Sequence, residues 1–467
     1  MVRKSRQPTA AELAELVDCP KNEYDEQLKN KSASLKGYIS RAMGGENEVE
    51  INGVYASSPV LFRQRVNFRV VLENDEVHFV MYSRNSNGQP LRIENFPRGD
   101  RLVNAWMPIV RSELNRLPAL RRHVIECRFH TTLRGGGMIL LCYNKPIGRE
   151  WLESAELLRT QILEATPNEG TVLLVGRSHK LQLVVPECSE EAAVTETLHI
   201  NTDPPLTLQY KQLEGEFTQP NAQVCEKMIQ WVIESTKYSN NDKDLLELYC
   251  GNGNFSVALA HNFRKVLATE LSKHNIVVAR HNALVNNLTN VKCIRLAANE
   301  VAEALTPGAR SFTRLVEQQV QLSDYDFGAV LVDPPRAGVE EAALKLLASF
   351  PRIIYFSCNP ESLARDLLFL RQTHALDQLA VFDQFPYTEH IECGLILRKM
   401  PEPKNNFSSI GEQPAFSPSS RGRGKSQSGT KEKRKQPSSI SSSDSKGGSG
   451  GPAKKRRRLF ARGCTLM

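Results

Sequence analysis

Hydrophobic and polar residues follow two different rhythms along this chain of 467 residues. Residues 21–43 have the spacing of an amphipathic helix, and from residue 54 to about 200 short alternating runs such as VNFRVVLE predict strands. Helical stretches over 100–117 and 151–165 interrupt the strands, and the glycine run after Arg134 predicts a hairpin. Residues 1–205 are therefore predicted to form an N-terminal helix and an α+β region.

From residue 206 onward, buried strands alternate with helices. The strand candidates are LLELYC (245–250), KVLATE (265–270), GAVLVD (328–333) and RIIYFSC (352–358). Because a helical stretch follows each of them, residues 206–400 are predicted to form an α/β domain with a doubly wound, largely parallel sheet. Residues 401–467 are rich in Ser, Gly, Pro, Lys and Arg and cannot bury enough apolar surface to offset folding entropy, so we predict a disordered tail.

Charge and cysteine content sharpen this picture. The formal net charge is +8, but residues 401–467 hold 15 Lys/Arg against 4 Asp/Glu, a net +11, whereas residues 1–400 hold 45 against 48, a net −3. RNA or DNA binding by the folded part would therefore need a local basic patch. We find no apolar run that could span a membrane and no secretory signal. The ten cysteines include no CxxC pair, which predicts free thiols in a reducing compartment and no metal site.

Residues with ligand chemistry follow the carboxyl ends of the predicted parallel strands, the edge where such sheets bind ligands. The Gly-Asn-Gly-Asn turn at 251–254 lets a ligand approach the backbone, and Glu270 is placed to accept hydrogen bonds from a ribose diol. The turn is not GxGxxG, and no phosphate-binding Lys or Ser/Thr follows it. A ligand with a ribose but no pyrophosphate, such as S-adenosylmethionine, fits this pattern.

The Asp-Pro-Pro-Arg run at 333–336 ends another strand. Two prolines exclude regular strand or helix, so we expect Asp333 and Arg336 to be held at the strand mouth. Methyltransferases that act on exocyclic amines place an aromatic residue after the prolines of a related motif. Arg336 stands there in this chain, which argues against an amine target.

Cys358 directly follows a predicted buried strand and precedes a helix. A thiolate there can add to C6 of uracil, which makes C5 a carbon nucleophile toward a sulfonium methyl group. A base must then remove the C5 proton before the cysteine leaves. Glu392 is the preferred candidate for this base, and Glu389 and His390 are weaker ones.

Taken together and in this order, these runs resemble the tRNA (uracil-5-)-methyltransferase family. The resemblance covers about residues 21–400 and is carried by FTQPN, LLELYCGNGNF, VLATE, VDPPRAG, FSCNPESL and FDQFPYTEHIECG. It implies a Rossmann-like class I methyltransferase domain that uses S-adenosylmethionine to form 5-methyluridine in the T loop of tRNA. It also implies that the α+β region grips the T arm and that the target uridine is flipped out.

The resemblance also implies roles for individual residues. Cys358 matches the family's nucleophile and Glu392 its base. The positions that match its cofactor site are Gln219, Tyr249, Asn254, Glu270 and Asp333, to which the glycine turn adds Gly251. From the strand pattern we expect an RNA-contacting face of Arg63, Arg65 and Arg69, together with Arg336 at the site itself.

Two other interpretations stay open. The same chemistry could serve ribosomal or another RNA, although we see neither the N-terminal barrel nor the clustered cysteines of the related ribosomal-RNA enzymes. The chain could also be a noncatalytic factor that binds or folds tRNA, but both Cys358 and Glu392 are present.

The tail carries two further signals. The basic run at 454–458 predicts nuclear import or an RNA-binding arm, and the final CTLM places Cys464 in a prenylation pattern that would add membrane association. We therefore expect an intracellular protein, at the nucleus, nuclear envelope or endomembrane if these signals act and cytoplasmic otherwise. We also expect a monomer.

Overall fold

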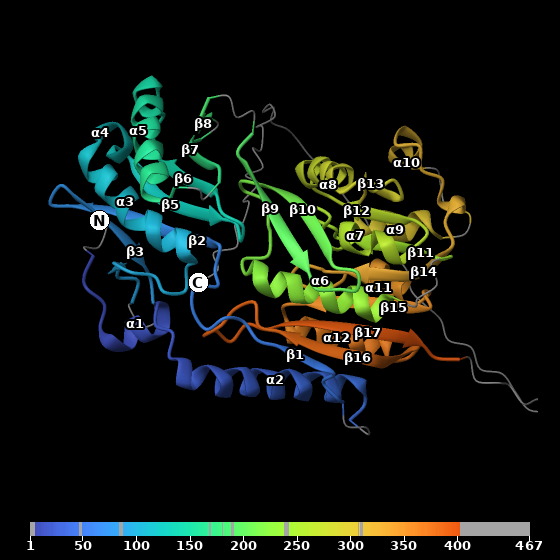
Figure 1. Ribbon diagram of the computed structural model, residues 1–467. Helices are drawn as coiled ribbons and strands as arrows, with labels where there is room; N and C mark the ends of the chain where they lie inside the picture. The colour runs from blue at the N-terminus through green and yellow to red at the C-terminus, as the bar shows by residue number, and fades with distance from the viewer. Residues whose placement is uncertain are drawn as a thin grey trace, which may run out of the picture. The chain divides into compact units, whose positions relative to one another are not determined.

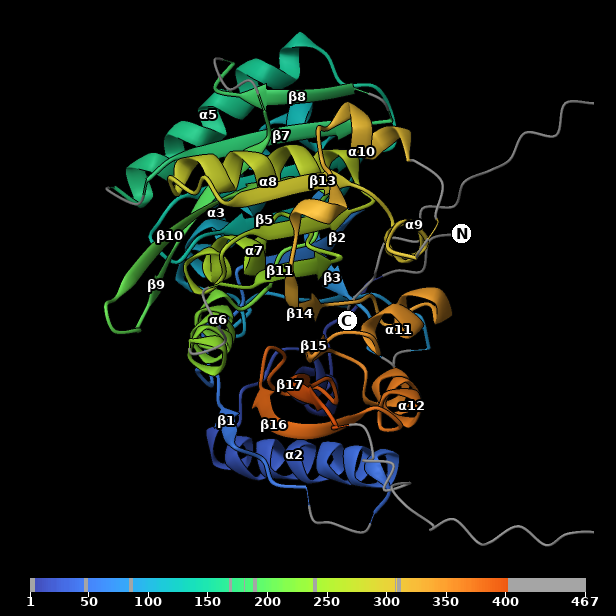
Figure 2. The same ribbon diagram turned by 90° about the vertical axis from the view of Figure 1, so that its right-hand side faces the viewer.

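The computed structural model describes residues 5–45, 49–83, 87–167, 170–179, 181–187, 191–237, 242–306, 308 and 312–401 (Figures 1 and 2). The predicted tail from residue 402, with its basic run and Cys464, lies outside these residues, and so does Cys188. The strands of the described residues form a seven-stranded sheet, an eight-stranded sheet and a two-stranded pair. No helix in these ranges is both long and apolar enough to cross a membrane.

The seven-stranded sheet belongs to the predicted α+β region and has the strand order β4-β3-β2-β5-β6-β7-β8. Its strands are β2 (Arg65–Glu73), β3 (Glu76–Met81), β4 (Leu91–Arg92), β5 (Val124–Thr131), β6 (Gly137–Tyr143), β7 (Val172–Ser178) and β8 (Leu181–Val185). Helices α3 (Arg101–Arg116) and α5 (Arg149–Ala165) pack on it, with Trp106 and Trp151 buried in the shared core. The α3 helix begins where the Asp100 carboxylate accepts a hydrogen bond from the Val103 amide at 2.8 Å, which is a helix N-cap. The predicted hairpin after Arg134 is confirmed as the antiparallel β5–β6 pair.

The eight-stranded sheet has the order β1-β16-β17-β15-β14-β11-β12-β13. Its strands are β1 (Gly53–Tyr55), β11 (Asp244–Leu248), β12 (Val266–Glu270), β13 (Val291–Arg295), β14 (Phe327–Val332), β15 (Arg352–Ser357), β16 (His374–Phe382) and β17 (Glu392–Lys399). Neighbouring strands run parallel except β17, which is antiparallel to both β15 and β16. The predicted Rossmann-like, largely parallel sheet is confirmed, with one reversed strand inserted between β15 and β16.

Helix α2 (Lys21–Met43) corrects the predicted grouping of residues 1–205. It forms over the predicted range, but it packs along α12 (Pro360–Leu370) on the eight-stranded sheet, as Figures 1 and 2 both show. Its apolar stripe, which includes Leu28, Leu35 and Ile39, is buried in the core of that sheet. The following strand, β1, pairs in parallel with β16. The N-terminal helix therefore joins the methyltransferase-like part because its apolar face is buried there.

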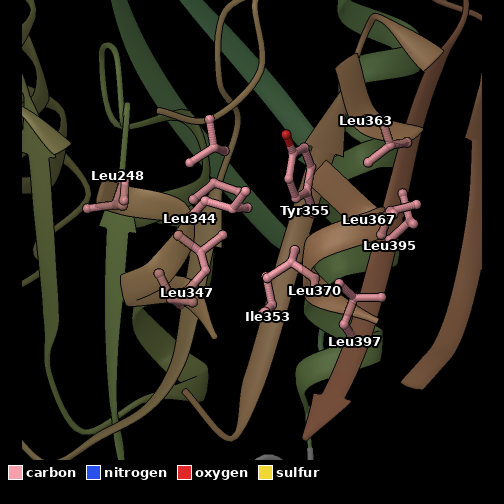
Figure 3. Packing of buried hydrophobic residues seen from close by; sticks show 14 of the residues in the cluster. Leu248, Leu344, Leu347, Ile353, Tyr355, Leu363, Leu367, Leu370, Leu395 and Leu397 are labelled. Atoms are coloured by element: carbon pink, nitrogen blue, oxygen red, sulfur yellow. The ribbon is translucent and has the colours of Figure 1, made fainter. Parts of the chain in front are cut away.

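The core beneath the carboxyl edge is built from leucine side chains of β11, β17, α11 (Glu341–Leu347) and α12, together with Ile353 and Tyr355 of β15 (Figure 3). Each fully buried leucine contributes roughly 1.5–3 kcal/mol. Tyr355 is the polar exception: its hydroxyl donates to Asp366 Oδ2 at 2.7 Å, and the Val339 amide donates to the same oxygen at 2.9 Å. The buried Asp366 thus ties the loop that follows β14 to helix α12.

The β9–β10 pair connects the two larger sheets along the chain. Strands β9 (Ala193–Ile200) and β10 (Leu206–Leu213) are antiparallel and pack on α6 (Ala222–Thr236) and on α8 (Lys273–Val285). The Tyr210 hydroxyl of β10 donates to the backbone oxygen of Asn254 at 2.9 Å. This pair therefore supports the start of α7 (Asn254–Leu259), where the predicted ligand turn lies.

Candidate active site at the carboxyl edge of the eight-stranded sheet

The first part of the site is the turn from β11 into α7. Tyr249, Gly251 and Gly253 all have positive φ angles of 61°, 54° and 84°, and glycine adopts such angles without the strain that a side chain brings. A Cβ atom added to Gly253 would contact Ala279 at 3.4 Å, whereas one on Gly251 would meet no atom within 4 Å. The turn therefore leaves open space over Gly251, directly before a helix N-terminus.

Glu270, at the end of the neighbouring strand β12, faces this turn. Its carboxylate accepts hydrogen bonds from the Gly251 amide at 3.2 Å and from the Ser272 amide at 2.7 Å. Ser272 in turn caps helix α8. Backbone groups thus fix the carboxylate beside the open space, as the strand-end argument predicts.

Asn254 presents a buried donor with no partner among the described residues. Its Nδ2 atom makes no hydrogen bond, although its Oδ1 atom accepts from the Cys225 thiol at 3.4 Å. Tyr249 is half-buried near the Glu340 backbone, and burial raises the pKa of its hydroxyl to about 12. An unpaired buried amide is costly, so this position is suited to a ligand acceptor.

Gln219 lies in the segment that leads into α6. The Arg65 guanidinium donates to the Glu216 carbonyl at 2.8 Å and to Thr218 Oγ1 at 3.0 Å, just before Gln219. The Gln64 side chain accepts from the Ala222 amide at 2.9 Å. The α+β region therefore holds this segment in place from both sides.

The second part of the site begins at the end of β14, with Asp333 and the two prolines. The loop closes through a hydrogen bond from the Gly338 amide to the Pro335 carbonyl at 2.8 Å. The Asn359 side-chain amide reaches across from the next strand and donates to the Arg336 carbonyl at 2.8 Å. Asn359 was not singled out from the sequence, but its place at the N-cap of α12, before Pro360, is a recognisable signal.

Cys358 and Glu392 meet through the register of β15 and β17. Ser357 pairs with Cys393 in this antiparallel ladder, so the next positions outward on the two strands are Cys358 and Glu392. Directly opposed residues in such ladders have Cα atoms about 4.5–5.5 Å apart. The structure thus brings the predicted nucleophile and the predicted base together at the carboxyl edge, with Cys358 half-buried and Glu392 buried.

Acidic groups crowd this part of the site. Burial, and after it the charges of the nearby Glu392 and Asp333 carboxylates, raise the pKa of the Cys358 thiol to about 12, against the opposing charge of Arg336. Burial and the charge of Asp333 raise the pKa of Glu392 well above its ordinary value, and burial raises that of Asp333. The three groups therefore hold protons more firmly than they would in water.

Arg336 and His390 form a further contact at the mouth. Arg336 Nη2 lies 3.4 Å from His390 Nε2, and the His390 ring meets the edge of Phe385 with centroids 6.0 Å apart. Of the candidate bases, His390 therefore lies beside Arg336, whereas Glu392 lies opposite the Cys358 thiol.

The three predicted RNA-contacting arginines do not share one strand face. Strand β2 begins at Arg65, so Arg63 lies before it, with its Nε atom donating to the Arg65 carbonyl at 2.9 Å. Arg65 points to the segment before Gln219, and only Arg69 is well exposed among the three, paired with Glu126 at 3.7 Å. The alternation on a strand face is thus wrong for Arg63, because the strand starts later than the pattern indicates. Contact of these residues with RNA stays a prediction.

Curated bacterial relatives match most of this chain. A tRNA/tmRNA (uracil-C(5))-methyltransferase of Pectobacterium atrosepticum is 38% identical over 380 residues, which is 81% of this chain and 98% of that protein. An enzyme of the same name from Aliivibrio fischeri is 38% identical over 388 residues, which is 83% of this chain and 100% of that protein. The similarity thus spans nearly the whole of each relative.

A solved structure has a similar fold. The tRNA (uracil-54, C5)-methyltransferase of Pyrococcus abyssi, in complex with S-adenosyl-L-homocysteine, aligns with a TM-score of 0.58 at 18% identity. The alignment covers 82% of this chain and 86% of that one. At this identity the likeness supports the fold and no more.

These relatives correct the expected location. The curated relatives come from bacteria, whose cells have no nucleus, so the expectation of a nuclear or nuclear-envelope location is wrong. That expectation depended on the basic run at 454–458 and on Cys464, which lie beyond the described residues. Nothing in the described residues or the relatives supports prenylation or membrane association through Cys464.

The family model gives the last comparison. The model described as tRNA (Uracil-5-)-methyltransferase matches residues 23–400, which include all but the first two residues of helix α2, both larger sheets and every predicted site residue. The matched range is similar in length to the parts of this chain that align with the bacterial relatives and with the solved structure. The chain therefore belongs to the tRNA (uracil-5-)-methyltransferase family and is an enzyme that methylates tRNA at uracil C5.

Proposed function

We propose that this enzyme forms 5-methyluridine at nucleotide 54 of the tRNA T loop, with Cys358 as nucleophile and Glu392 as the base that removes the C5 proton. The observation that carries the proposal is the β15–β17 register, which sets these two residues opposite each other at the carboxyl edge. The nucleotide position is that in the name of the Pyrococcus abyssi enzyme. A thiol and a carboxylate on adjacent strands can act on the two neighbouring ring carbons C6 and C5.

The residues of the β11–β12 edge fit S-adenosylmethionine as methyl donor. Open space lies over Gly251, the Glu270 carboxylate beside it suits a ribose diol, and the Asn254 amide offers an unpaired buried donor. Tyr249 and Asp333 directly follow the neighbouring strands β11 and β14, and with Gln219, which precedes α6, they complete the proposed binding set. When bound, this cofactor supplies an electrophilic methyl group on sulfonium sulfur.

Cys358 begins the reaction on the uracil. Its thiol first loses the proton to solvent water, and the sulfur then forms a bond to C6 while the C5–C6 electron pair shifts toward C5 and the O4 oxygen. The positive charge of Arg336 opposes the raised pKa of the thiol and so favours this step. C5 becomes a carbon nucleophile, which would take the methyl group as the bond from that group to the donor's sulfonium sulfur breaks and leaves a neutral thioether.

Glu392 ends the reaction. As a carboxylate it accepts the proton from C5, the electron pair re-forms the C5–C6 double bond, and the sulfur of Cys358 leaves C6 as thiolate. Because burial raises the pKa of Glu392, the group binds the abstracted proton firmly. The products are the Cys358 thiolate, 5-methyluridine and the thioether that the methyl donor would become. The thiol proton has gone to water and the C5 proton to Glu392, so atoms and electrons balance.

The substrate must present an unstacked uridine. C5 and C6 of a base stacked within a folded tRNA loop are not accessible from both sides, so the nucleotide has to turn out into the site. Residues 64 and 65 of the α+β region make hydrogen bonds to the segment 216–222 beside the site, so this region is in place to hold the RNA around the flipped base.

The test uses an unmodified tRNA transcript, S-adenosylmethionine and the purified enzyme. Mass spectrometry of nuclease digests is expected to find 5-methyluridine at nucleotide 54, and none with Cys358→Ala. Cys142→Ala, which removes a thiol from the seven-stranded sheet, is the matched control and should keep full activity. Methylation of ribosomal RNA but not of tRNA would overturn the substrate. Tight tRNA binding without methylation of any RNA would favour a noncatalytic role.

A further inference from the structure

The loop that leads into Glu392 is unusually long, and residues of helix α2 and of the α+β region make contacts that hold it. Residues 383–391, here called the β16–β17 loop, join two adjacent antiparallel strands whose connections normally have 2–5 residues. We propose that Asp383 and Tyr387 are positioning residues, through which helix α2 and the α+β region hold Glu392 in place for removal of the C5 proton. This inference rests on the role of Glu392 proposed above.

Asp383 is the first anchor. Its side chain is fully buried, and Lys31 of α2 pairs with Oδ1 at 2.7 Å while the Tyr24 hydroxyl donates to Oδ2 at 2.9 Å. Lys31 also donates to the Phe385 carbonyl at 3.0 Å. The Ser57 amide donates to the Tyr24 oxygen at 2.8 Å. Both carboxylate oxygens are therefore satisfied by one helix, which compensates for the burial of the charge.

Tyr387 is the second anchor. Its amide donates to Gln27 Oε1 of α2 at 2.7 Å, and its hydroxyl donates to the Pro59 carbonyl at 2.9 Å. Its φ angle of 60° is unusual for a tyrosine, so the surrounding contacts hold the backbone in this conformation. The Arg98 guanidinium lies over its ring, 5.3 Å from the centroid.

Arg98 makes this anchor a link between the two sheets. It lies between β4 and α3 of the α+β region and is buried, and its Nη2 atom donates to the Asp18 carbonyl at 3.0 Å. The Phe62 ring also contacts Tyr387, with centroids 6.4 Å apart. Residues of the region expected to bind RNA thus touch the loop that carries the base.

The two reacting residues are held by different supports. Cys358 follows β15 and is backed by Asn359, which caps α12 and binds the Arg336 carbonyl. Glu392 depends on the β16–β17 loop for its approach to β17. A base must lie within hydrogen-bond reach of its proton, and a shift of about 1 Å can cost about 100-fold. Loosening the loop should therefore slow proton removal while thiol addition and methyl transfer continue.

The expected signature is a trapped covalent intermediate. If the C5 proton is removed slowly, methylated RNA stays bound to Cys358 and survives on a denaturing gel. A general loss of stability would instead reduce methyl transfer, adduct and product together. The amount of adduct per turnover thus separates positioning from a merely structural role.

The experiment compares Tyr387→Phe, Gln27→Ala and Lys31→Met with wild type, using tRNA transcript and S-adenosylmethionine labelled in the methyl group. We expect turnover to fall about tenfold and the methylated adduct to rise severalfold, with an unchanged KM for S-adenosylmethionine. Lys29→Met is the matched control, since Lys29 lies on the same helix with its side chain exposed, and it should behave as wild type. Thermal unfolding shows which variants are folded, and Tyr387→Phe and Gln27→Ala decide the question if Lys31→Met is not.

Glu392→Gln separates failure of the inference from failure of the proposed function. It should accumulate more methylated adduct than any loop variant. If it does so while the folded loop variants show wild-type adduct levels per turnover, the positioning roles of Asp383 and Tyr387 are overturned. If Glu392→Gln itself turns over normally, the assignment of the base is wrong and this inference falls with it.

Discussion

The two halves of the carboxyl edge are built on different principles. At β11 and β12, backbone amides hold the Glu270 carboxylate at 3.2 and 2.7 Å, and three positive φ angles shape an open turn. At β14, β15 and β17, titratable side chains crowd together, and burial raises the pKa values of Asp333, Cys358 and Glu392. The half at β11 and β12, the cofactor half, is thus fixed by hydrogen bonds. The half at β14, β15 and β17, the reacting half, consists of groups whose raised pKa values favour their protonated forms.

This difference matches the two tasks of a methyl transfer to carbon. A ligand with a ribose needs fixed acceptors and donors, which backbone groups supply without reorganisation. Addition of a thiol and removal of a carbon-bound proton need groups that hold and release protons. The same sheet edge can serve both because parallel strands bring their carboxyl ends together while β17 adds a residue from the opposite direction.

The largest effect expected from this comparison is on pH dependence. Cys358 must lose its proton to add to C6, and Glu392 must be deprotonated to release the product. Both groups have raised pKa values, so the rate at which free 5-methyluridine forms in a single turnover should fall as pH falls. Below the pKa of a required group the rate drops tenfold per pH unit, which gives about 100-fold or more between pH 9 and pH 7. Quench-flow measurements on tRNA transcript would show this. Cofactor affinity, measured by calorimetry, should be flat over the same range; a flat rate profile would contradict the contrast between the halves.

Glu270→Ala should weaken cofactor binding at β11 and β12 and leave the chemistry at β14, β15 and β17 unchanged. Loss of a charged acceptor for the ribose hydroxyls is expected to reduce affinity for S-adenosylmethionine by about 10–100-fold, the equivalent of about 1.5–3 kcal/mol. The rate at saturating cofactor and the pH profile should stay close to wild type. Calorimetry and steady-state kinetics check this, with the exposed Glu317→Ala as control. A shifted pH profile with unchanged affinity would assign Glu270 to the other half.

Asp333→Asn tests whether Asp333 acts on the reacting groups or on the cofactor. Of the three substitutions and conditions compared, it should change the reaction rate least. Its negative charge raises the pKa values of Cys358 and Glu392, so its removal should move the rising limb of the pH–rate profile to lower pH, by up to about one unit. A loss of cofactor affinity without this shift would place Asp333 in the cofactor half alone. Profiles for the variant and wild type, recorded with the same transcript, distinguish the two results.

Much of the site could be predicted because it depends on local order. Gly251 lies in the turn after β11, and Glu270 is the last residue of β12. Because the carboxyl ends of parallel strands share one edge, the meeting of these two residues could be predicted without knowledge of distant contacts. Cys358 could be placed for the same reason. The Arg65 prediction fared less well: the strand pattern indicates an outward arginine, but its guanidinium donates to Glu216 and Thr218. Those partners are separated from it by more than a hundred residues.

By itself, the sequence determined the strand–helix rhythm, the glycine turn and the residues at the strand ends, since these follow from periodicity and from backbone sterics. Only the tertiary structure decided that β17 inserts antiparallel between β15 and β16, which sets Glu392 opposite Cys358. It also decided that α2 leaves the α+β region to bind Asp383 through Lys31. Strand order, register and helix docking arise from hydrogen bonds and apolar contacts between distant segments, and no local pattern of residues encodes them.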